Sequence, residues 1–327
     1  MPLDLDAIDR ADARLIQAGL KHFGFYDGTM FGVPGPKTKD AYRRYLSKDG
    51  AEPAAMIAAE PPAEPAGMLS YRKSVREEFE YPGEVGEGTR GRKARRIQEW
   101  LSIQGFRTSI DEEFGPATER ALQCFQRARG LPDTGQVDEK TWNALVAPMI
   151  RALSRCAAGA SFGDTVERVA KQHLREHPIE LGGANCGPWV RAYMDGNQGR
   201  AWAWCAGFVT FVLNQAAAIH GVSMPVEGSF SCDLLASQAK AEQRFVSERS
   251  INAAAGKWSE SELGACCVFL VRRTSGDWTH TGFAFDYRPD GTFATIEGNT
   301  NDEGSREGFE VCERFRSRKD KDFICLV

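Results

Sequence analysis

Residues 202–209 carry the sequence WAWCAGFV, and apolar residues then recur at helical spacing as far as Ala216. This pattern predicts a helix that begins at or near Cys205. The unpaired N–H groups and the positive dipole end at a helix N-terminus stabilise a thiolate and lower the pKa of the thiol. Cys205 is therefore the first candidate for a catalytic nucleophile.

A cysteine nucleophile needs a base, and His280 is the best placed of the five histidines. It begins an alternating run that a four-residue turn signal separates from a second predicted strand. Pairing of Tyr287 with Thr292 sets the register of this hairpin. In that register His280 lies opposite Asn299, and Glu297 lies one diagonal step away on the same face. Either Glu297 or Asn299 could orient the imidazole, with Glu297 preferred, which gives an arrangement suited to attack on an amide carbonyl.

The other cysteines are weaker candidates for a nucleophile. There are nine in all, an odd number with no CxxC pair, which argues against a disulfide framework. Cys186 lies in a glycine-rich loop and Cys232 precedes another helical pattern, so these two are the rivals of Cys205. Cys266 and Cys267 precede a predicted core strand, where cysteines are usually inert.

A competing metal signal occurs in residues 173–177, which read HLREH. This matches the H-x-x-E-H pattern of zinc proteases and would place His173 and His177 on one helical face. No third ligand is evident, and His177 lies at a predicted helix end before a proline. We therefore expect two exposed helix histidines, no bound metal and no cofactor.

Length and composition limit the classes of protein to consider. The 41 Lys and Arg and 45 Asp and Glu among 327 residues give a net charge of -4. Nucleic-acid binders carry a basic excess, so nucleic acid is not expected as a partner. No apolar run reaches the ~18 residues of a membrane span. The N-terminus lacks the basic and apolar parts of a secretory signal, so we expect synthesis in the cytoplasm without a signal peptide.

Two segments of the N-terminal half are alike. Each has Ile-Gln, Gly-Phe, Gly-Pro-X-Thr and Ala at matching positions, the first starting at Ile16 and the second at Ile97. Each is typical of a helix, a loop and a second helix, and in the second copy Asp138 caps a third short helix. Residues 51–67 between the copies are rich in Pro, Ala and Glu and predict a semi-extended linker. The pattern indicates a duplicated module, truncated in the first copy.

The second copy carries a Phe-Gly-Pro-Ala-Thr run at 114–118, a Phe-Gln pair at 125–126 and a Thr-Trp pair at 141–142. In these residues it resembles the peptidoglycan-binding module of bacterial and phage cell-wall hydrolases, and the first copy matches in part. The resemblance implies bacterial peptidoglycan as a partner. The expected N-terminal organisation is a degenerate module, a linker and a complete module, at residues 1–49, 50–90 and 91–150.

Four short motifs follow one another in the C-terminal half. They are Asn-Cys-Gly, Trp-Cys-Ala-Gly-Phe-Val, His-Thr-Gly and Ile-Glu-Gly-Asn-Thr, beginning at positions 185, 204, 280 and 296. In their order and spacing, residues 165–315 resemble the cysteine/histidine-dependent amidohydrolase/peptidase (CHAP) family, a papain-like fold of peptidoglycan amidases and endopeptidases. The resemblance implies that Cys205 is the nucleophile and His280 the general base. It implies Glu297 as the third member and Asn299 as a supporting polar residue.

These patterns and resemblances predict a multidomain chain. The expected fold is two small all-α, three-helix wall-binding modules followed by an α+β papain-like domain with an antiparallel sheet at residues 155–327. The expected function is a cysteine-dependent peptidoglycan hydrolase, either an N-acetylmuramoyl-L-alanine amidase or a stem-peptide or cross-bridge endopeptidase. The alternatives are a zinc-dependent wall peptidase that uses His173 and His177, and a wall-binding protein without activity.

The expected biological setting has two forms. A wall-directed protein without an export signal fits a phage lysin, or an antibacterial effector secreted into the periplasm of a rival cell. In both forms the protein would act on the cell wall after release or delivery. An effector would add an immunity protein or a secretion-system component to its partners. The sequence does not choose between the two forms and predicts no oligomeric state.

Overall fold

The computed structural model describes most of the chain and parts of its start. The described residues are 5, 16–17, 20, 36–46, 67–253, 259–301 and 308–326. Of the predicted module at residues 1–49, the helix α2 (Pro36–Leu46) and four isolated residues are described. Residues 50–66 of the predicted linker lie outside the described residues. Within the described part of the chain, no helix has the length and apolar character needed to cross a membrane.

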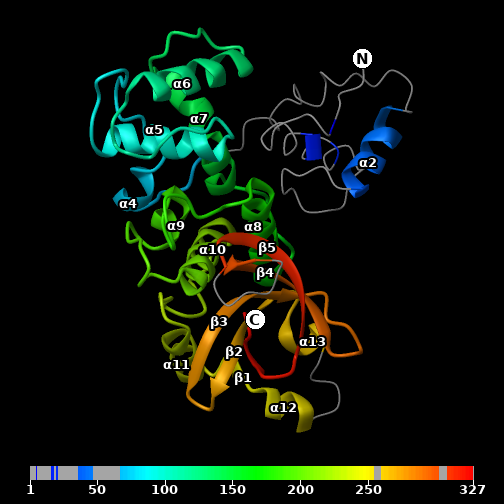
Figure 1. Cartoon of the computed structure of the whole chain (residues 1–327). Helices are drawn as coiled ribbons and strands as arrows, with labels where there is room; N and C mark the ends of the chain where they lie inside the picture. The colour runs from blue at the N-terminus through cyan, green and yellow to red at the C-terminus, as the bar shows by residue number, and fades with distance from the viewer. Residues whose placement is uncertain are drawn as a thin grey trace.

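A helical domain forms one end of the molecule (Figure 1). It consists of α5 (Arg92–Ile103), α6 (Pro116–Ala128) and α7 (Glu139–Leu153). Pro116 starts α6, where its missing N–H is not needed, and Asp138 caps α7 by accepting a 2.8 Å bond from the N–H of Thr141. The apolar faces of the helices bury three large rings, those of Trp100, Phe125 and Trp142. The second and third helices of the complete module therefore begin where the sequence predicts.

Residues 67–90, which the sequence assigns to the linker, pack on this helical domain. They contain the short helix α4 (Lys73–Arg76) and form isolated β-bridges with the domain. The carbonyl of Phe79 accepts a 2.7 Å bond from the indole N–H of Trp142. These contacts use backbone groups and single side chains, so no sequence periodicity indicates them. The described part of the predicted linker is thus an integral part of the helical domain.

The two copies of the sequence repeat share one buried contact. In the first copy, the amide Nε2 of Gln17 donates a 3.0 Å hydrogen bond to Oγ1 of Thr38. In the second copy, Nε2 of Gln98 donates a 3.1 Å hydrogen bond to Oγ1 of Thr118. These residues occupy matching positions of the repeat, so the likeness in sequence extends to a likeness in local structure.

Within the described residues, the C-terminal part combines helices with a six-stranded antiparallel sheet. Its helices are α8 (Phe162–Glu176), α9 (Pro188–Tyr193), α10 (Cys205–His220), α11 (Cys232–Ala241), α12 (Glu248–Ala253) and α13 (Glu260–Leu263). Its strands are β1 (Phe245–Val246), β2 (Cys267–Thr274), β3 (Asp277–Phe285), β4 (Thr292–Thr300), β5 (Glu310–Ser317) and β6 (Lys321–Ile324). The strand order is β1-β6-β2-β3-β4-β5, and each neighbouring pair is antiparallel. The predicted antiparallel sheet is therefore confirmed.

Side chains alternate between the two faces of the sheet along each strand. Apolar residues of other elements pack against both faces. On β3, the ring of Phe283 meets the ring of Phe208 on α10, with centroids 6.0 Å apart. The next residue, Ala284, belongs to a second apolar cluster on the opposite face, together with residues of α12 and α13. Helix α10 thus lies directly against the central strands of the sheet (Figure 1).

The hairpin of β3 and β4 has the predicted register. Phe283 pairs with Ile296, and the neighbouring residues pair in step. Ala284 pairs with Thr295 and Phe285 with Ala294, while β4 becomes irregular between Glu297 and Thr300. The alternating pattern and the turn signal were therefore sufficient to define the register.

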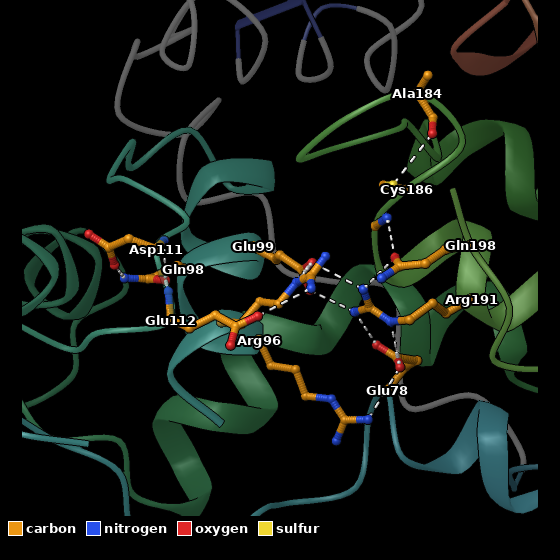
Figure 2. Close-up of polar contacts among 12 residues, drawn as sticks. Glu78, Arg96, Gln98, Glu99, Asp111, Glu112, Ala184, Cys186, Arg191 and Gln198 are labelled. Carbon is orange, nitrogen blue, oxygen red and sulfur yellow. Dashed lines mark hydrogen bonds and ion pairs between the residues drawn. The ribbon is translucent and has the colours of Figure 1, made fainter. Parts of the chain in front are cut away.

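The helical domain docks on the C-terminal part through a buried cluster of charges (Figure 2). Arg191 of α9 is its centre, because its Nη2 lies 2.7 Å from Oε2 of Glu78 and 2.6 Å from Oε2 of Glu99. The exposed fractions of these three side chains are 11%, 3% and 0%, respectively. The rings of Trp100 and Trp189 meet across the same junction, with centroids 6.0 Å apart. Charge pairing and apolar packing together hold the helical domain against the C-terminal part.

Replacing Arg191 with alanine is expected to lower the free energy of unfolding by about 3 kcal/mol, because Glu78 and Glu99 would stay buried with only their pairs to Arg96 and Arg95. Denaturant unfolding of the full-length chain measures this change. The matched control is Arg127→Ala, since the ion pair of Arg127 with Asp133 is exposed on both sides. Loss of this exposed pair should matter by less than about 1 kcal/mol. Equal losses in the two variants would contradict the importance of the buried cluster.

Candidate active site

Cys205 is the first residue of α10, as the sequence predicts, and it is 6% exposed. The preceding residue, Trp204, fixes this end of the helix. Its ring stacks on the ring of Tyr193 with centroids 5.6 Å apart, and its indole N–H donates a 2.8 Å bond to Glu180. The tryptophan beside the cysteine therefore holds the helix N-terminus in place.

Two glycines allow α10 and the strands to approach closely enough to form the site. A Cβ atom at Gly298 on β4 would lie 2.7 Å from the Cβ of Phe208, so a larger residue would push α10 away from the sheet. A Cβ atom at Gly282 on β3 would lie 2.8 Å from the Cγ of Glu297, so glycine leaves room for this side chain against the neighbouring strand. Both glycines belong to the motifs that begin at positions 280 and 296.

His280 on β3 connects the thiol of Cys205 with a buried carboxylate. Its Nε2 lies 2.8 Å from Oε2 of Glu297. The ring and the thiol of Cys205 influence each other's pKa, so the two groups lie near each other. Because Glu297 engages Nε2, Nδ1 is the ring nitrogen left for the sulfur. The structure therefore brings Cys205, His280 and Glu297 together at one site, where Glu297 binds the imidazole.

Glu297 is fully buried, and groups behind it balance its charge. Arg316 on β5 donates from Nε to Oε1 at 2.5 Å and from Nη2 to Oε2 at 2.6 Å. The hydroxyl of Thr295 donates a further bond of 2.6 Å to Oε1. This two-pronged pairing fixes the plane of the carboxylate and therefore the orientation of the imidazole. Sequence reasoning missed Arg316, because an arginine on an alternating strand gives no sign of its partner.

Electrostatics at the site favour a thiolate and an imidazolium. The hydrogen bond from Cys232, together with the bond and charge of His280, holds the pKa of Cys205 well below its ordinary value in spite of burial. Burial disfavours charge on His280, but its bonds to Cys205 and Glu297 outweigh this and raise the pKa of the imidazole to about 9. Burial likewise disfavours charge on Glu297, but the bonds from Arg316 and His280 lower the pKa of that carboxyl. These influences all favour a negative sulfur beside a positive ring.

Asn299 contacts the start of α10. With its amide oxygen turned toward the helix, this oxygen accepts a 3.1 Å bond from the N–H of Trp204, and the amide nitrogen donates a 2.7 Å bond to the carbonyl of Gly308. Its backbone has a φ of 53°, in the left-handed region that asparagine tolerates. Of the two residues that the sequence left open as partners of the imidazole, Glu297 is the one that forms the bond, and Asn299 joins β4 to the start of α10.

The two rival cysteines have different surroundings. The Sγ of Cys232, the first residue of α11, lies 3.9 Å from the Sγ of Cys205. Cys186 instead lies on a loop, where its thiol donates a 3.4 Å bond to the carbonyl of Ala184 (Figure 2). The sequence indicated a helix start at Cys232, but it could not show that two helix starts meet.

The histidines of the HLREH stretch are placed differently from the prediction. His173 is fully buried, and its ring nitrogens lie 2.9 Å from the hydroxyl of Tyr193 and 2.9 Å from Oε1 of Gln215. Burial lowers the pKa of His173 to about 4. His177 ends α8 in the left-handed conformation and pairs with Glu310 at 2.5 Å. The expectation of two exposed histidines was wrong, because the helical face that carries His173 turns into the core.

Among the described residues, no group of three or more His, Cys, Asp or Glu side chains has a geometry that could hold a metal ion. Both ring nitrogens of His173 are engaged in buried hydrogen bonds, so ligation by this ring would break one of them. The HLREH pattern therefore has a structural explanation in the packing of α8.

Replacing Glu297 with glutamine is expected to lower the pKa of His280 by about 1–3 pH units, because the ring loses the negative charge that stabilises its protonated form. NMR titration of the full-length chain, with the His280 signal assigned through His280→Gln, measures this pKa. Glu313→Gln is the matched control, since Glu313 is an exposed carboxylate on β5. An unchanged pKa in Glu297→Gln would show that the carboxylate does not support the imidazolium.

Comparisons with known proteins bear on the helical domain. Residues 90–145 match the family described as "Putative peptidoglycan binding domain". A zinc D-Ala-D-Ala carboxypeptidase of Streptomyces albus G is 33% identical over 72 residues, which are 20% of this chain and 28% of that protein. The chain therefore matches less than a third of the length of this relative. No solved structure gives a significant match.

These findings show a peptidoglycan-binding domain within residues 90–145 and support a function at the cell wall. The matched region overlaps the module predicted at 91–150. It ends before the residues that resemble the CHAP family, so it has no bearing on that resemblance. The sugar- or peptide-contacting residues of the domain are not identified by the match.

Proposed function

We propose that this chain is a peptidoglycan hydrolase whose C-terminal part, residues 155–327, cleaves an amide bond with the thiol of Cys205. The observation that carries the proposal is the placement of Cys205 at the start of α10 beside His280, whose ring Glu297 binds at 2.8 Å. A nucleophile, a base and an orienting group within hydrogen-bond reach are what thiol attack on an amide requires. The peptidoglycan-binding domain in the same chain supports the wall as the substrate. The resemblance to the CHAP family supports a papain-like fold for this part.

The proposed reaction begins with attack of the Cys205 thiolate on the amide carbonyl carbon. The imidazolium of His280 gives its proton to the departing amine, and the neutral ring then takes a proton from the water that hydrolyses the thioester. Glu297 holds the ring in one orientation through both steps. The side chain of His280 is 19% exposed, so a substrate can reach the ring from solvent.

The start of α10 contributes to the proposed mechanism through its backbone. The N–H of Cys205 lies at the free end of the helix, where no intrahelical partner is present. We assign it as one donor to the oxyanion that forms on the carbonyl oxygen. Asn299 supports this donor indirectly, because it binds the N–H of the adjacent Trp204 and so fixes the helix end.

The proposed substrate bond is an amide of peptidoglycan in one of two positions. An N-acetylmuramoyl-L-alanine amidase would cut between sugar and peptide, and an endopeptidase would cut within the stem or cross-bridge. The same thiol chemistry serves both reactions, so the shape of the groove decides between them. Mass spectrometry of the released muropeptides identifies the bond.

We propose that residues 91–150 hold the enzyme on the wall and that residues 1–49 form a second, degenerate module. The shared glutamine-to-threonine hydrogen bond of the two copies supports a common origin of their structure. Binding of the same chain to the wall raises the concentration of substrate at the thiol without any new catalytic contact. A phage lysin and a secreted antibacterial effector are the proposed settings, and an effector would have an immunity protein or a secretion-system component as a partner.

Wall clearing by purified protein tests the proposal. Cys205→Ala is expected to abolish clearing of purified cell walls while leaving sedimentation with the walls unchanged, because the peptidoglycan-binding domain remains intact. Cys124→Ala, which changes an exposed thiol on α6, should clear walls at the rate of the unmodified chain. A metal chelator is expected to have no effect on either protein.

Two results of this experiment would contradict the thiol mechanism. Full clearing by Cys205→Ala with inhibition by the chelator would favour a zinc-dependent peptidase, the activity that the name of the Streptomyces relative describes. Sedimentation with walls but no clearing by the unmodified chain would favour a wall-binding protein without activity.

A further inference from the structure

Cys232 lies beside Cys205 in the proposed active site. It is the first residue of α11, it is 8% exposed, and its Sγ lies 3.9 Å from the Sγ of Cys205. This distance is within the range of a hydrogen bond between two sulfur atoms. The proposed mechanism gives Cys232 no role, although it contacts the reacting atom directly.

The position of Cys232 is fixed by the residues on both sides of it. Ser231 caps α11 by accepting a 3.4 Å bond from the N–H of Leu234. On the other side, Oδ1 of Asp233 accepts a 2.7 Å bond from the N–H of Trp278 on β3. Trp278 stands two residues before His280 on the same strand, so α11 is attached to the strand that carries the proposed base.

The two thiols have opposite acid–base character. The contact with Cys232 is the largest of the influences that lower the pKa of Cys205, followed by the bond and charge of His280. The same contact raises the pKa of Cys232 well above its ordinary value, with burial and the adjacent charge of Asp233 adding to the effect. These opposite directions favour a proton on Cys232, and its S–H would then be the donor of the pair.

We propose that Cys232 is a further catalytic residue, whose S–H donates a hydrogen bond to the sulfur of Cys205 in the resting enzyme. This inference rests on the proposed function. Cys232 then reaches the sulfur from α11, and the charge of His280 on β3 acts on the same atom. Glu297 and Arg316 act on the sulfur only through His280.

The effect of Cys232 on the reaction depends on where the negative charge of the thiolate moves. On attack, the negative charge leaves the sulfur and moves to the carbonyl oxygen, so the bond from Cys232 stabilises the resting thiolate more than the later states. Such stabilisation raises the fraction of thiolate at low pH and makes the thiolate less nucleophilic. Cys232 thus sets how far the pH can fall before Cys205 loses its reactivity.

Alkylation of Cys205 by iodoacetamide as a function of pH tests this inference. The fully reduced full-length chain is labelled, and the modified peptides are resolved by mass spectrometry, so that labelling of Cys205 and Cys232 is counted separately. Cys232→Ala and Cys232→Val both remove the donor, and valine keeps the space filled. Both variants are expected to move the midpoint of the Cys205 profile about one pH unit higher, since a hydrogen bond to a charged group is lost.

A profile that superimposes on that of the unmodified chain in both variants would overturn the inference. A shift in Cys232→Ala alone would also overturn it, because it would assign the effect to packing and not to the S–H. Cys124→Ala serves as the control and should leave the profile unchanged. The assay uses no peptidoglycan, so its result does not depend on the proposed function. Failure of the proposed function would appear in the wall-clearing experiment instead.

Discussion

The buried carboxylate of Glu297 constrains the geometry of the whole C-terminal part. A fully buried negative charge must be paired, and here Arg316 supplies the charge from β5 while His280 supplies a donor from β3. Glu297 therefore ties three adjacent strands to one arrangement. Gly282 is the local condition for this, since any Cβ at that position would collide with the Glu297 side chain. Helix α10 brings the thiol of Cys205 to this site, because Gly298 allows the helix to lie close against the sheet.

A second buried cluster of charges has a comparable role at the junction with the helical domain, which includes residues 67–90. Arg191 pairs with Glu78 and Glu99, which come from two different segments of that domain (Figure 2). The ion pairs of Arg191 and the contact between Trp100 and Trp189 dock the helical domain on the C-terminal part. If the proposed function holds, a docked domain would present the thiol to the wall at a set distance and orientation, and would couple binding to cleavage through geometry as well as through local concentration.

Local patterns predicted those parts of the structure that depend on local physics. The helix start at Cys205 and the register that pairs Phe283 with Ile296 follow from spacing, alternation and turn residues. The sequence could not choose between Glu297 and Asn299 as the partner of the imidazole, because both lie near the end of the same strand. The structure shows that the side chain of Glu297 reaches the ring. Arg316 and Cys232 reach the site from other elements, and no spacing along the chain indicates such meetings. The burial of His173 was missed because periodicity gives the face of a helix but not what covers it.

The central claim is that the sulfur of Cys205 forms a covalent bond with the wall substrate. Rapid acid quenching of the full-length protein with purified peptidoglycan fragments, followed by mass spectrometry of the protein, tests this claim most directly. The account predicts a transient acyl adduct on the peptide that contains Cys205. Consumption of the fragments without an adduct on Cys205, or with the adduct on another cysteine, would contradict it.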